Sequence, residues 1–206
     1  MHEFPGNKVL TRSHMSSCIL GILLLAVLIP SNFCPAAGTP ANADRTPTEY
    51  EVKAAYIYYF AKFVNWPNDS FPSPNAPIRI GVLGDDQFGS LLETVVKDKT
   101  IQEHPISIRL LKWPVDFRSC HMIYISASEL KRAKQITEDL RGHAVLTVTE
   151  ADAGSQAKAI MNLFVEGGKV QFEIDVAGAE RAHLQISSKL LRLAHGTAAN
   201  RTARGE

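Results

Sequence analysis

Residues 78–86 have the sequence IRIGVLGDD, in which an apolar run ends at a glycine and two aspartates. The apolar run predicts a short β-strand. Asp85 and Asp86 predict the start of a helix, because an aspartate side chain accepts hydrogen bonds from the first free backbone N–H groups of a helix. Four apolar residues then recur at helical spacing: Phe88, Leu91, Leu92 and Val95. The stretch therefore predicts a strand that turns directly into an amphipathic helix.

The same alternation continues along the chain. Residues 106–111 predict the next strand, and short strand–helix–strand units form right-handed parallel crossovers. A second unit has strands at 121–125 and 144–148. Its helix is predicted to begin at a capping box from Ser126 to Glu129 and to end at Gly142. Two such units predict a parallel sheet.

A hairpin is predicted after these units, because apolar and polar residues alternate on both sides of the pair Gly167-Gly168. Counting outward from that turn pairs apolar residues three times: Val165 with Val170, Leu163 with Phe172 and Met161 with Ile174. Both strands then place their apolar side chains on one face. Short helices at 177–184 and 188–195 complete the chain. The predicted fold is a three-layer α/β/α sheet of parallel strand–helix–strand units with a C-terminal antiparallel hairpin.

An aromatic helix is predicted at residues 48–65, ahead of the first strand. Thr46 to Glu49 is interpreted as a capping box, and Trp66-Pro67 ends the helix. Glu49 and Lys53 form an i,i+4 pair that is assigned to a separate face. The main apolar stripe comprises Val52, Ala55, Tyr56, Tyr59, Phe60 and Phe63.

This helix carries more aromatic residues than one core-facing stripe requires. Seven of the 16 aromatic residues of the chain lie within residues 50–66, and Tyr50 and Tyr58 fall off the main stripe. In the last helix Leu190, Leu193 and Ala194 are predicted to share a face, which leaves Leu191 pointing elsewhere. Two interpretations follow: Tyr50, Tyr58 and Leu191 belong to a partner surface, or both helices are buried against opposite sides of the sheet.

The N-terminal residues 1–43 have the order of a secretory signal peptide. Lys8 and Arg12 precede an apolar run at 19–29, and small residues follow it. The run is shorter than the roughly 20 residues that cross a bilayer, which makes a membrane anchor the less favoured alternative. We expect cleavage between Ala36 and Ala43 and export to the periplasm.

The mature chain is expected to be one α/β domain over residues 44–196, with a polar flexible tail at 197–206. Cleavage removes two of the three cysteines and leaves Cys120, so no internal disulfide bond can form. Cys120 is interpreted as a buried structural thiol.

No pattern in the chain indicates catalysis. The 22 basic and 21 acidic residues give a net charge of +1, which gives no reason to expect nucleic-acid binding. The glycines at 81–89 fit neither dinucleotide nor P-loop spacing, and the histidines show no metal-ligand spacing and are expected on the surface or in loops. Cys120 and His121 are neighbours on a strand and point to opposite faces, so they do not form a nucleophile and base. We assign no catalytic residue, cofactor or metal.

Three blocks together resemble the YfiR-like family of periplasmic proteins. They are residues 51–67 (EVKAAYIYYFAKFVNWP), residues 80–84 with 88–89 and 120–126, and residues 161–163 with 170–174 and 186–194. They occur in this order over nearly the whole mature chain, and the first and third blocks are specific.

The resemblance implies an α/β binding regulator that is often dimeric. The best-known member restrains an inner-membrane diguanylate cyclase by contacting its periplasmic part, and an outer-membrane lipoprotein sequesters it. That arrangement links the periplasm to cyclic-di-GMP signalling and biofilm formation. The family prototype has intramolecular disulfides, and this chain departs from it with Cys120 alone.

A second interpretation comes from a different class of function. The chain could be a periplasmic small-molecule-binding module of a sensory or transport system. Its ligand would then occupy the crevice at the carboxyl ends of the parallel strands, near Gly84 and Ser126.

Overall fold

The computed structural model describes residues 45–152 and 159–197. The predicted signal peptide lies outside these residues, and so does the predicted tail at 197–206 except for Thr197, which belongs to a strand. The elements are α1 (Glu49–Phe63), β1 (Val64–Asn65), η1 (Asn68–Ser70), β2 (Ile78–Leu83), α2 (Asp86–Val96), β3 (Thr100–Ile101), β4 (His104–Leu111), η2 (Phe117–Ser119), β5 (Met122–Ile125), η3 (Ala127–Glu129), α3 (Leu130–Asp139), β6 (Leu146–Glu150), β7 (Met161–Glu166), β8 (Lys169–Ile174), α4 (Val176–Arg181), β9 (Gln185–Ile186), α5 (Ser188–Leu193) and β10 (Gly196–Thr197).

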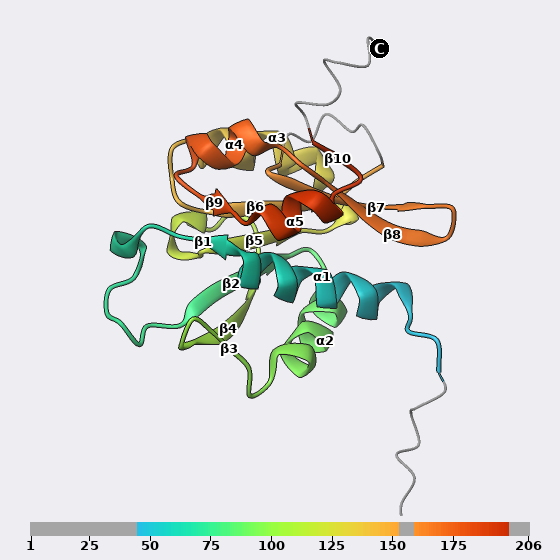
Figure 1. The fold of residues 1–206 in the computed structure, drawn as a ribbon, viewed down its shortest axis with the longest axis horizontal. Helices are drawn as coiled ribbons and strands as arrows, with labels where there is room; N and C mark the ends of the chain where they lie inside the picture. Colours follow the sequence, from blue (N-terminus) through green and yellow to red (C-terminus); the bar gives the residue numbers. More distant parts are fainter. Residues whose placement is uncertain (1–44, 153–158, 198–206) are drawn as a thin grey trace, which may run out of the picture. The chain divides into compact units, whose positions relative to one another are not determined.

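The main sheet has the strand order β10-β8-β7-β6-β5-β2-β4-β3 (Figure 1). Strands β4, β2, β5, β6 and β7 run parallel to their neighbours in this series. The antiparallel pairs lie toward its two ends, where β8 pairs with β7 and β3 with β4. A separate antiparallel pair joins β1 to β9. The predicted α/β class and both parallel units are confirmed.

The hairpin register agrees with the prediction residue by residue. Val165 pairs with Val170, Leu163 with Phe172 and Met161 with Ile174. Gly167 and Gly168 have φ angles of 57° and 73°. Two consecutive positive φ angles are what a type I′ two-residue turn requires, and glycine adopts them without steric cost.

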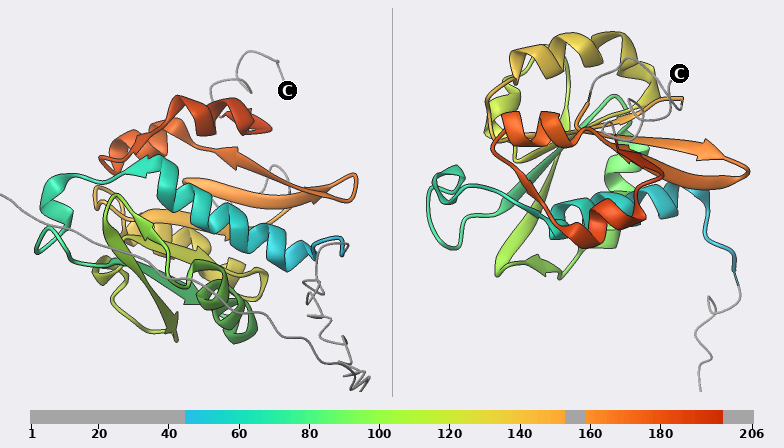
Figure 2. Two further views of the ribbon diagram at one scale, coloured as in Figure 1. Left: turned by 60° about the horizontal axis from the view of Figure 1, so that its bottom comes forward. Right: turned by 45° about the horizontal axis from the view of Figure 1, so that its top comes forward.

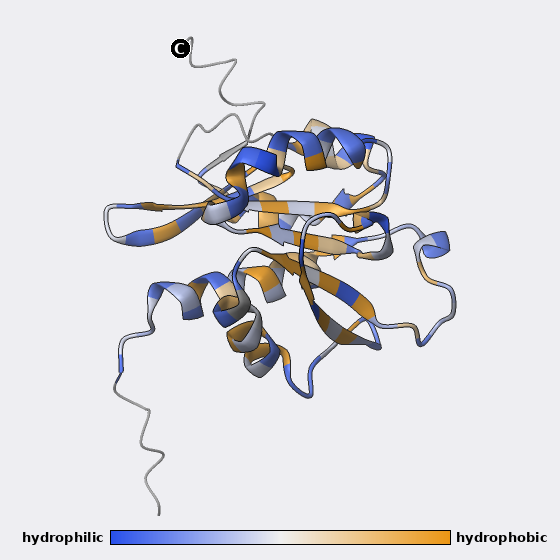
Figure 3. Cartoon of the chain, turned by 180° about the vertical axis from the view of Figure 1, so that it is seen from behind, coloured by the Kyte–Doolittle hydropathy of each residue, from blue (hydrophilic) through white to orange (hydrophobic). Residues whose placement is uncertain are grey.

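Two apolar layers enclose the sheet. Side chains of α1, α2, α4 and α5 join one face in the larger core cluster, and α3 packs on the other face with the segment that contains η2. Figure 2 shows α1 across one side of the sheet and α3 on the opposite side. Figure 3 shows that the central strands are largely apolar, as burial on both faces requires. The predicted three-layer architecture is confirmed.

The first helix covers Glu49–Phe63 instead of the predicted 48–65, and its N-cap lies two residues later than predicted. Thr48, not Thr46, is the N-cap, and Glu51 completes the capping box. The backbone N–H of Thr48 donates to Glu51 Oε2 at 2.7 Å, and the N–H of Glu51 donates to Thr48 Oγ1 at 3.3 Å. Hydrogen bonds from Arg45 and Thr48 lower the pKa of Glu51 to about 2. The sequence contains two overlapping Thr-x-x-Glu patterns, which begin at Thr46 and Thr48. The ion pair between Arg45 and Glu51 favours the second pattern.

The second predicted capping box is wrong. Ser126 precedes the short 3₁₀ helix η3, and α3 begins only at Leu130. The Ser126 hydroxyl forms a hydrogen bond with the Ser128 hydroxyl at 2.8 Å, while Glu129 forms an ion pair with Arg132. Both side chains therefore have partners other than the helix terminus.

Gly84 directly follows β2 and has a φ angle of 90°. A Cβ atom at this position would lie 2.4 Å from Glu129 Cγ and 2.6 Å from Ser126 Oγ. We predict that Gly84→Ala lowers the free energy of unfolding by about 3 kcal/mol, because backbone strain and overpacking add. The matched control is Gly142→Ala, where φ is 78° but nothing lies within 4 Å of the added atom. It should cost only about 1 kcal/mol. Urea denaturation measures both, and equal losses would contradict the packing argument.

Candidate interaction surface

A buried ion pair fixes α1 to the sheet. The Lys53 side chain is 2% exposed, and its Nζ donates to Glu150 Oε1 at 2.6 Å and to Glu49 Oε1. Glu150 is the last residue of β6, and its other oxygen accepts a hydrogen bond from the hydroxyl of Tyr124 on β5. The helix is thereby joined to the carboxyl ends of two neighbouring parallel strands.

Lys53 and Tyr124 both keep their protons at neutral pH. Burial by itself lowers the pKa of Lys53, but the hydrogen bonds and charges of Glu150 and Glu49 outweigh it and the pKa is raised. Burial, and then the Glu150 carboxylate, raise the pKa of Tyr124. Lys53 therefore stays an ammonium and Tyr124 stays a protonated donor.

This anchor decides which face of α1 meets the core. The buried residues of the helix are Lys53, Ala54, Ile57, Phe60 and Ala61. The predicted stripe is wrong in its orientation, because only Phe60 of its six members is buried. The face that carries Lys53, assigned to a separate side in the sequence, is the one that packs on the sheet.

The opposite side of α1 is also apolar, and we call it the outer face of α1: Val52, Ala55, Tyr59 and Phe63. Their spacing of three or four residues places them on one side of a helix. Tyr59 is 47% exposed, and its ring stacks on Phe63 with centroids 6.2 Å apart. Val52, Ala55 and Phe63 are half-buried, and Phe63 also packs partly on the core. The helix thus has an apolar face on the core and a second one toward solvent.

Helix α5 lies beside α1 (Figures 1 and 2), where β1 pairs with β9 and the N–H of Ser187 donates to Phe63 O at 2.9 Å. Leu190 is buried, Leu191 is half-buried, and Leu193 is 69% exposed. The prediction that Leu193 shares the face of Leu190 is wrong. The helix ends at Leu193 because Ala194 has an extended backbone. We call the outer face of α1 together with Leu191 and Leu193 the α1–α5 surface.

The three predicted interface residues differ in exposure. Tyr50 is 44% exposed, but it faces the carboxyl edge of the sheet, where its ring lies 5.3 Å from Lys53 Nζ and 6.0 Å from the Phe88 ring. Tyr58 is half-buried, with Lys99 Nζ 4.8 Å from its ring centre. Leu191 packs partly on the core. Their neighbours Tyr59 and Leu193 are the side chains that protrude.

A crevice of about 440 Å³ lies at the carboxyl ends of β2 and β4, at the position predicted for a small-molecule site. Gly84, Lys112, Trp113, Glu129 and Arg132 are among its lining residues. The Arg132 guanidinium lies 5.7 Å from the Trp113 ring centre and forms an ion pair with Glu129. The crevice thus combines an aromatic ring with charges of both signs.

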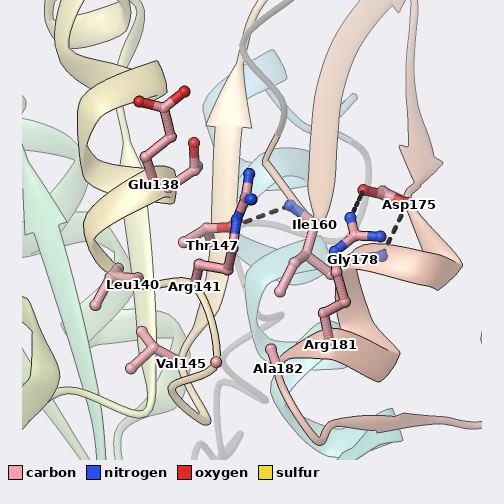
Figure 4. A pocket seen from close by; sticks show the side chains of 12 residues that line it. Glu138, Leu140, Arg141, Val145, Thr147, Ile160, Asp175, Gly178, Arg181 and Ala182 are labelled. Carbon is pink, nitrogen blue, oxygen red and sulfur yellow. Dashed lines mark hydrogen bonds and ion pairs between the residues drawn. The ribbon is translucent and has the colours of Figure 1, made fainter.

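A second cavity of about 380 Å³ lies between α3 and α4 (Figure 4). Arg141 and Arg181 are among its lining residues, with Thr147 on β6 and Ile160 just before β7. Asp175 accepts hydrogen bonds from the Gly178 N–H at 2.9 Å and from Arg181 at 3.1 Å. Asp175 and Arg181 are therefore already paired with each other, and we assign no ligand to the cavity.

Cys120 and His121 lie on opposite faces, as predicted. Cys120 is 3% exposed and packs in the core cluster on the α3 side, where burial raises the pKa of its thiol. His121 contacts Trp66 and Phe71. The expectation that the histidines lie on the surface or in loops is wrong for His121, which is 2% exposed.

A family model described as YfiR/HmsC-like matches residues 50–195. The chain belongs to the YfiR/HmsC-like family. Proteins of this family are periplasmic regulators in cyclic-di-GMP signalling, with a regulatory rather than a catalytic role. The match includes α5 and all of α1 except Glu49, and therefore the whole α1–α5 surface. Across residues 45–152 and 159–197 of this YfiR/HmsC-like protein, no helix has the length and apolar character needed to span a membrane.

The anchor can be tested by substitution. We predict that Lys53→Met lowers the free energy of unfolding by about 3 kcal/mol, because Glu150 loses its charged partner in a largely buried position. Lys62→Met is the matched control on the same helix, where the side chain is exposed, and should change stability by less than about 0.5 kcal/mol. Urea denaturation measures both variants. A Lys53→Met protein as stable as the wild type would show that the ion pair does not hold α1.

Proposed function

We propose that this protein is a non-enzymatic periplasmic regulator that binds and restrains an inner-membrane signalling protein, a diguanylate cyclase or a similar enzyme. Binding would take place through the α1–α5 surface. The consequence would be a lower output of cyclic di-GMP and less biofilm formation. Family membership supports the regulatory role.

One observation supports the choice of surface: α1 is apolar on the side that faces away from the core. Helix α1 is held by Lys53 on its inner side, so the outer face has a fixed position. Tyr59 and Leu193 are 47% and 69% exposed. Aromatic and leucine side chains that protrude from such a surface gain free energy when a partner buries them, and tyrosine is enriched among residues that dominate binding.

The charges beside this surface indicate the chemistry of the partner. Exposed basic residues border the C-terminal half of α1 and α5: Lys62, Lys99, Lys189 and Arg192. The described residues of α5 include no acidic side chain. We therefore expect the client to present carboxylates beside an apolar strip, which would speed association and make it sensitive to salt.

Two further associations follow from the family resemblance and are part of the proposal. An outer-membrane lipoprotein would sequester the regulator, and the regulator would form a homodimer. Either association could use the α1–α5 surface in competition with the client.

The decisive variants replace protruding residues of the surface. We predict that Tyr59→Glu and Leu193→Glu fold normally but weaken client binding about tenfold or more, because a charge would have to be buried without a partner. A strain that carries either variant should then have the high cyclic-di-GMP level of a strain that lacks the gene. Cyclic di-GMP is measured in cell extracts, and melting is measured on purified protein.

Val165→Glu is the matched control, because Val165 is also 47% exposed but lies in the β7–β8 hairpin. It should keep cyclic di-GMP at the wild-type level. Tyr58→Glu and Leu191→Glu should lose stability as well, since both residues pack partly on the core. Normal cyclic-di-GMP levels with both Tyr59→Glu and Leu193→Glu would exclude the α1–α5 surface as the client site.

A second candidate function rests on the crevice at Gly84. The order of the strands changes direction at β2: the connection from β2 leads to β4 on one side, and the connection from β4 leads back to β5 on the other side. Parallel sheets bind ligands at such switch points. With Lys112, Arg132 and Trp113 in its lining, the crevice would suit a small molecule that has an acidic group beside a planar ring.

A ligand screen separates the two functions. Aromatic acids that occupy the crevice should raise the melting temperature, and the increase should disappear in Arg132→Ala. Lys134→Ala, an exposed position on the same helix, is the control and should keep it. The absence of any stabilising compound, together with the loss of regulation in Tyr59→Glu, would favour protein binding alone.

A further inference from the structure

His121 lies at the centre of a stack of rings between the sheet and the segment that follows α1. The His121 ring lies against the ring of Phe71, with centroids 4.6 Å apart and planes at 17°. The opposite partner of Phe71 is His104, with centroids 4.1 Å apart and planes at 16°. Trp66 meets His121 edge-on at 6.2 Å. Phe71 is therefore held between two histidines.

The hydrogen bonds of His121 define its protonation state. Its Nδ1 lies 3.0 Å from the backbone N–H of Arg79, and an N–H can only donate, so Nδ1 accepts and carries no proton. Its Nε2 lies 3.1 Å from the carbonyl oxygen of Ser70, which can only accept, so Nε2 carries the proton. Both contacts are satisfied by the neutral ring in one tautomer.

These contacts attach residues 67–77, which connect β1 to β2. His121 holds the segment through the Ser70 carbonyl and the Phe71 ring, and His104 Nδ1 lies 2.7 Å from the carbonyl oxygen of Ala76. Trp66, just before the segment, donates from its indole N–H to the backbone carbonyl of His121 at 3.0 Å. Residues 72–75 between these attachments are exposed. Three of these four contacts involve His121, and one involves His104.

We propose that His121 is an acid-sensitive latch: a proton on its Nδ1 releases residues 67–77 from the sheet. Protonation would turn the acceptor into a donor that faces the Arg79 N–H, so the hydrogen bond at 3.0 Å would be lost. It would also place a charge in a buried position. The charged groups that face the ring are the guanidinium of Arg79 on β2 and, beyond Phe71, the imidazole of His104 on β4. No carboxylate contacts the ring in the part of the chain that the structure describes.

The sign of the pH dependence follows from the pKa of His121. Burial lowers this pKa from its usual 6.5, and the neighbouring Arg79 guanidinium and His104 imidazole lower it further, against the opposing hydrogen bond to Ser70. The open state then binds the proton more tightly than the closed state. Opening is independent of pH above about 6.5 and becomes up to about tenfold more favourable for each pH unit below it, until the pKa of the closed state is reached.

The experiment follows Trp66 as a reporter beside the latch. Of the two tryptophans, Trp113 is replaced by Phe, and Trp66 fluorescence is recorded between pH 7.5 and 5.0. Hydrogen exchange of residues 67–80, corrected for the intrinsic effect of pH, is measured in the same range. We expect exposure of Trp66 and a loss of protection of at least tenfold at pH 5.0, while α1 stays protected.

His121→Asn removes the titration and leaves an amide oxygen where Nδ1 accepts from Arg79. It should abolish the pH dependence, whereas His104→Gln, on the other side of Phe71, should retain it. A histidine NMR titration of the wild type provides a readout that needs no variant, because the midpoint of opening must coincide with the titration of His121. Constant protection of residues 67–80 down to pH 5.0, a transition that persists in His121→Asn, or one that is lost in His104→Gln would each overturn the proposal.

Discussion

The contact between Lys53 and Glu150 is the interaction on which the arrangement of α1 depends. A lysine side chain that is 2% exposed is tolerated only because two carboxylates accept from its Nζ, and one of them stands at the end of β6. Tyr124 orients that carboxylate from the neighbouring strand. Once Lys53 faces the sheet, the helical repeat turns Ala54, Ile57 and Phe60 into the core and Tyr59 outward. The apolar outer face of α1 is therefore a consequence of an ion pair on the inner one.

The sheet topology makes this anchor possible. In a parallel sheet, the carboxyl ends of successive strands meet at one edge, so Tyr124 and Glu150 come together although 26 residues separate them. The same edge carries Gly84 after β2, and so the crevice lies close to it in the fold. At the other end of α1, the β1–β9 pair brings α5 beside the helix. Two independent constraints thus place the two helices that form the α1–α5 surface.

Parts of the fold that rest on local patterns are predictable from the sequence. The hairpin register follows from alternation around Gly167-Gly168, because a slip of one residue would turn every apolar side chain to the other face. The orientation of α1 is not predictable in this way. Hydrophobic periodicity assigns lysine to solvent, and the partner that buries Lys53 is 97 residues away in the chain. The sequence predicts the i,i+4 pair of Glu49 and Lys53, but the burial of Lys53 depends on its contact with Glu150.

Local sequence patterns also fail to predict which side chains of the α1–α5 surface are exposed. The aromatic excess of α1 cannot decide that Tyr59 rather than Tyr58 protrudes, since that choice depends on the rotation of the helix. The predicted shared face of Leu190, Leu193 and Ala194 does not exist, because α5 ends at Leu193 and the Leu193 side chain is exposed. The burial of His121 is not predictable from the sequence, because its two backbone partners, Arg79 and Ser70, come from segments far away in the chain.

The central claim is that the outer face of α1 contacts the client. It is tested most directly by a photoreactive phenylalanine analogue at position 59, irradiated in living cells, with the same analogue at position 165 as a reference. If the outer face of α1 contacts the client, position 59 cross-links to an inner-membrane protein that mass spectrometry identifies as a diguanylate cyclase or related signalling protein, and position 165 does not. A cross-link to that protein from position 165 and none from position 59 would contradict the claim.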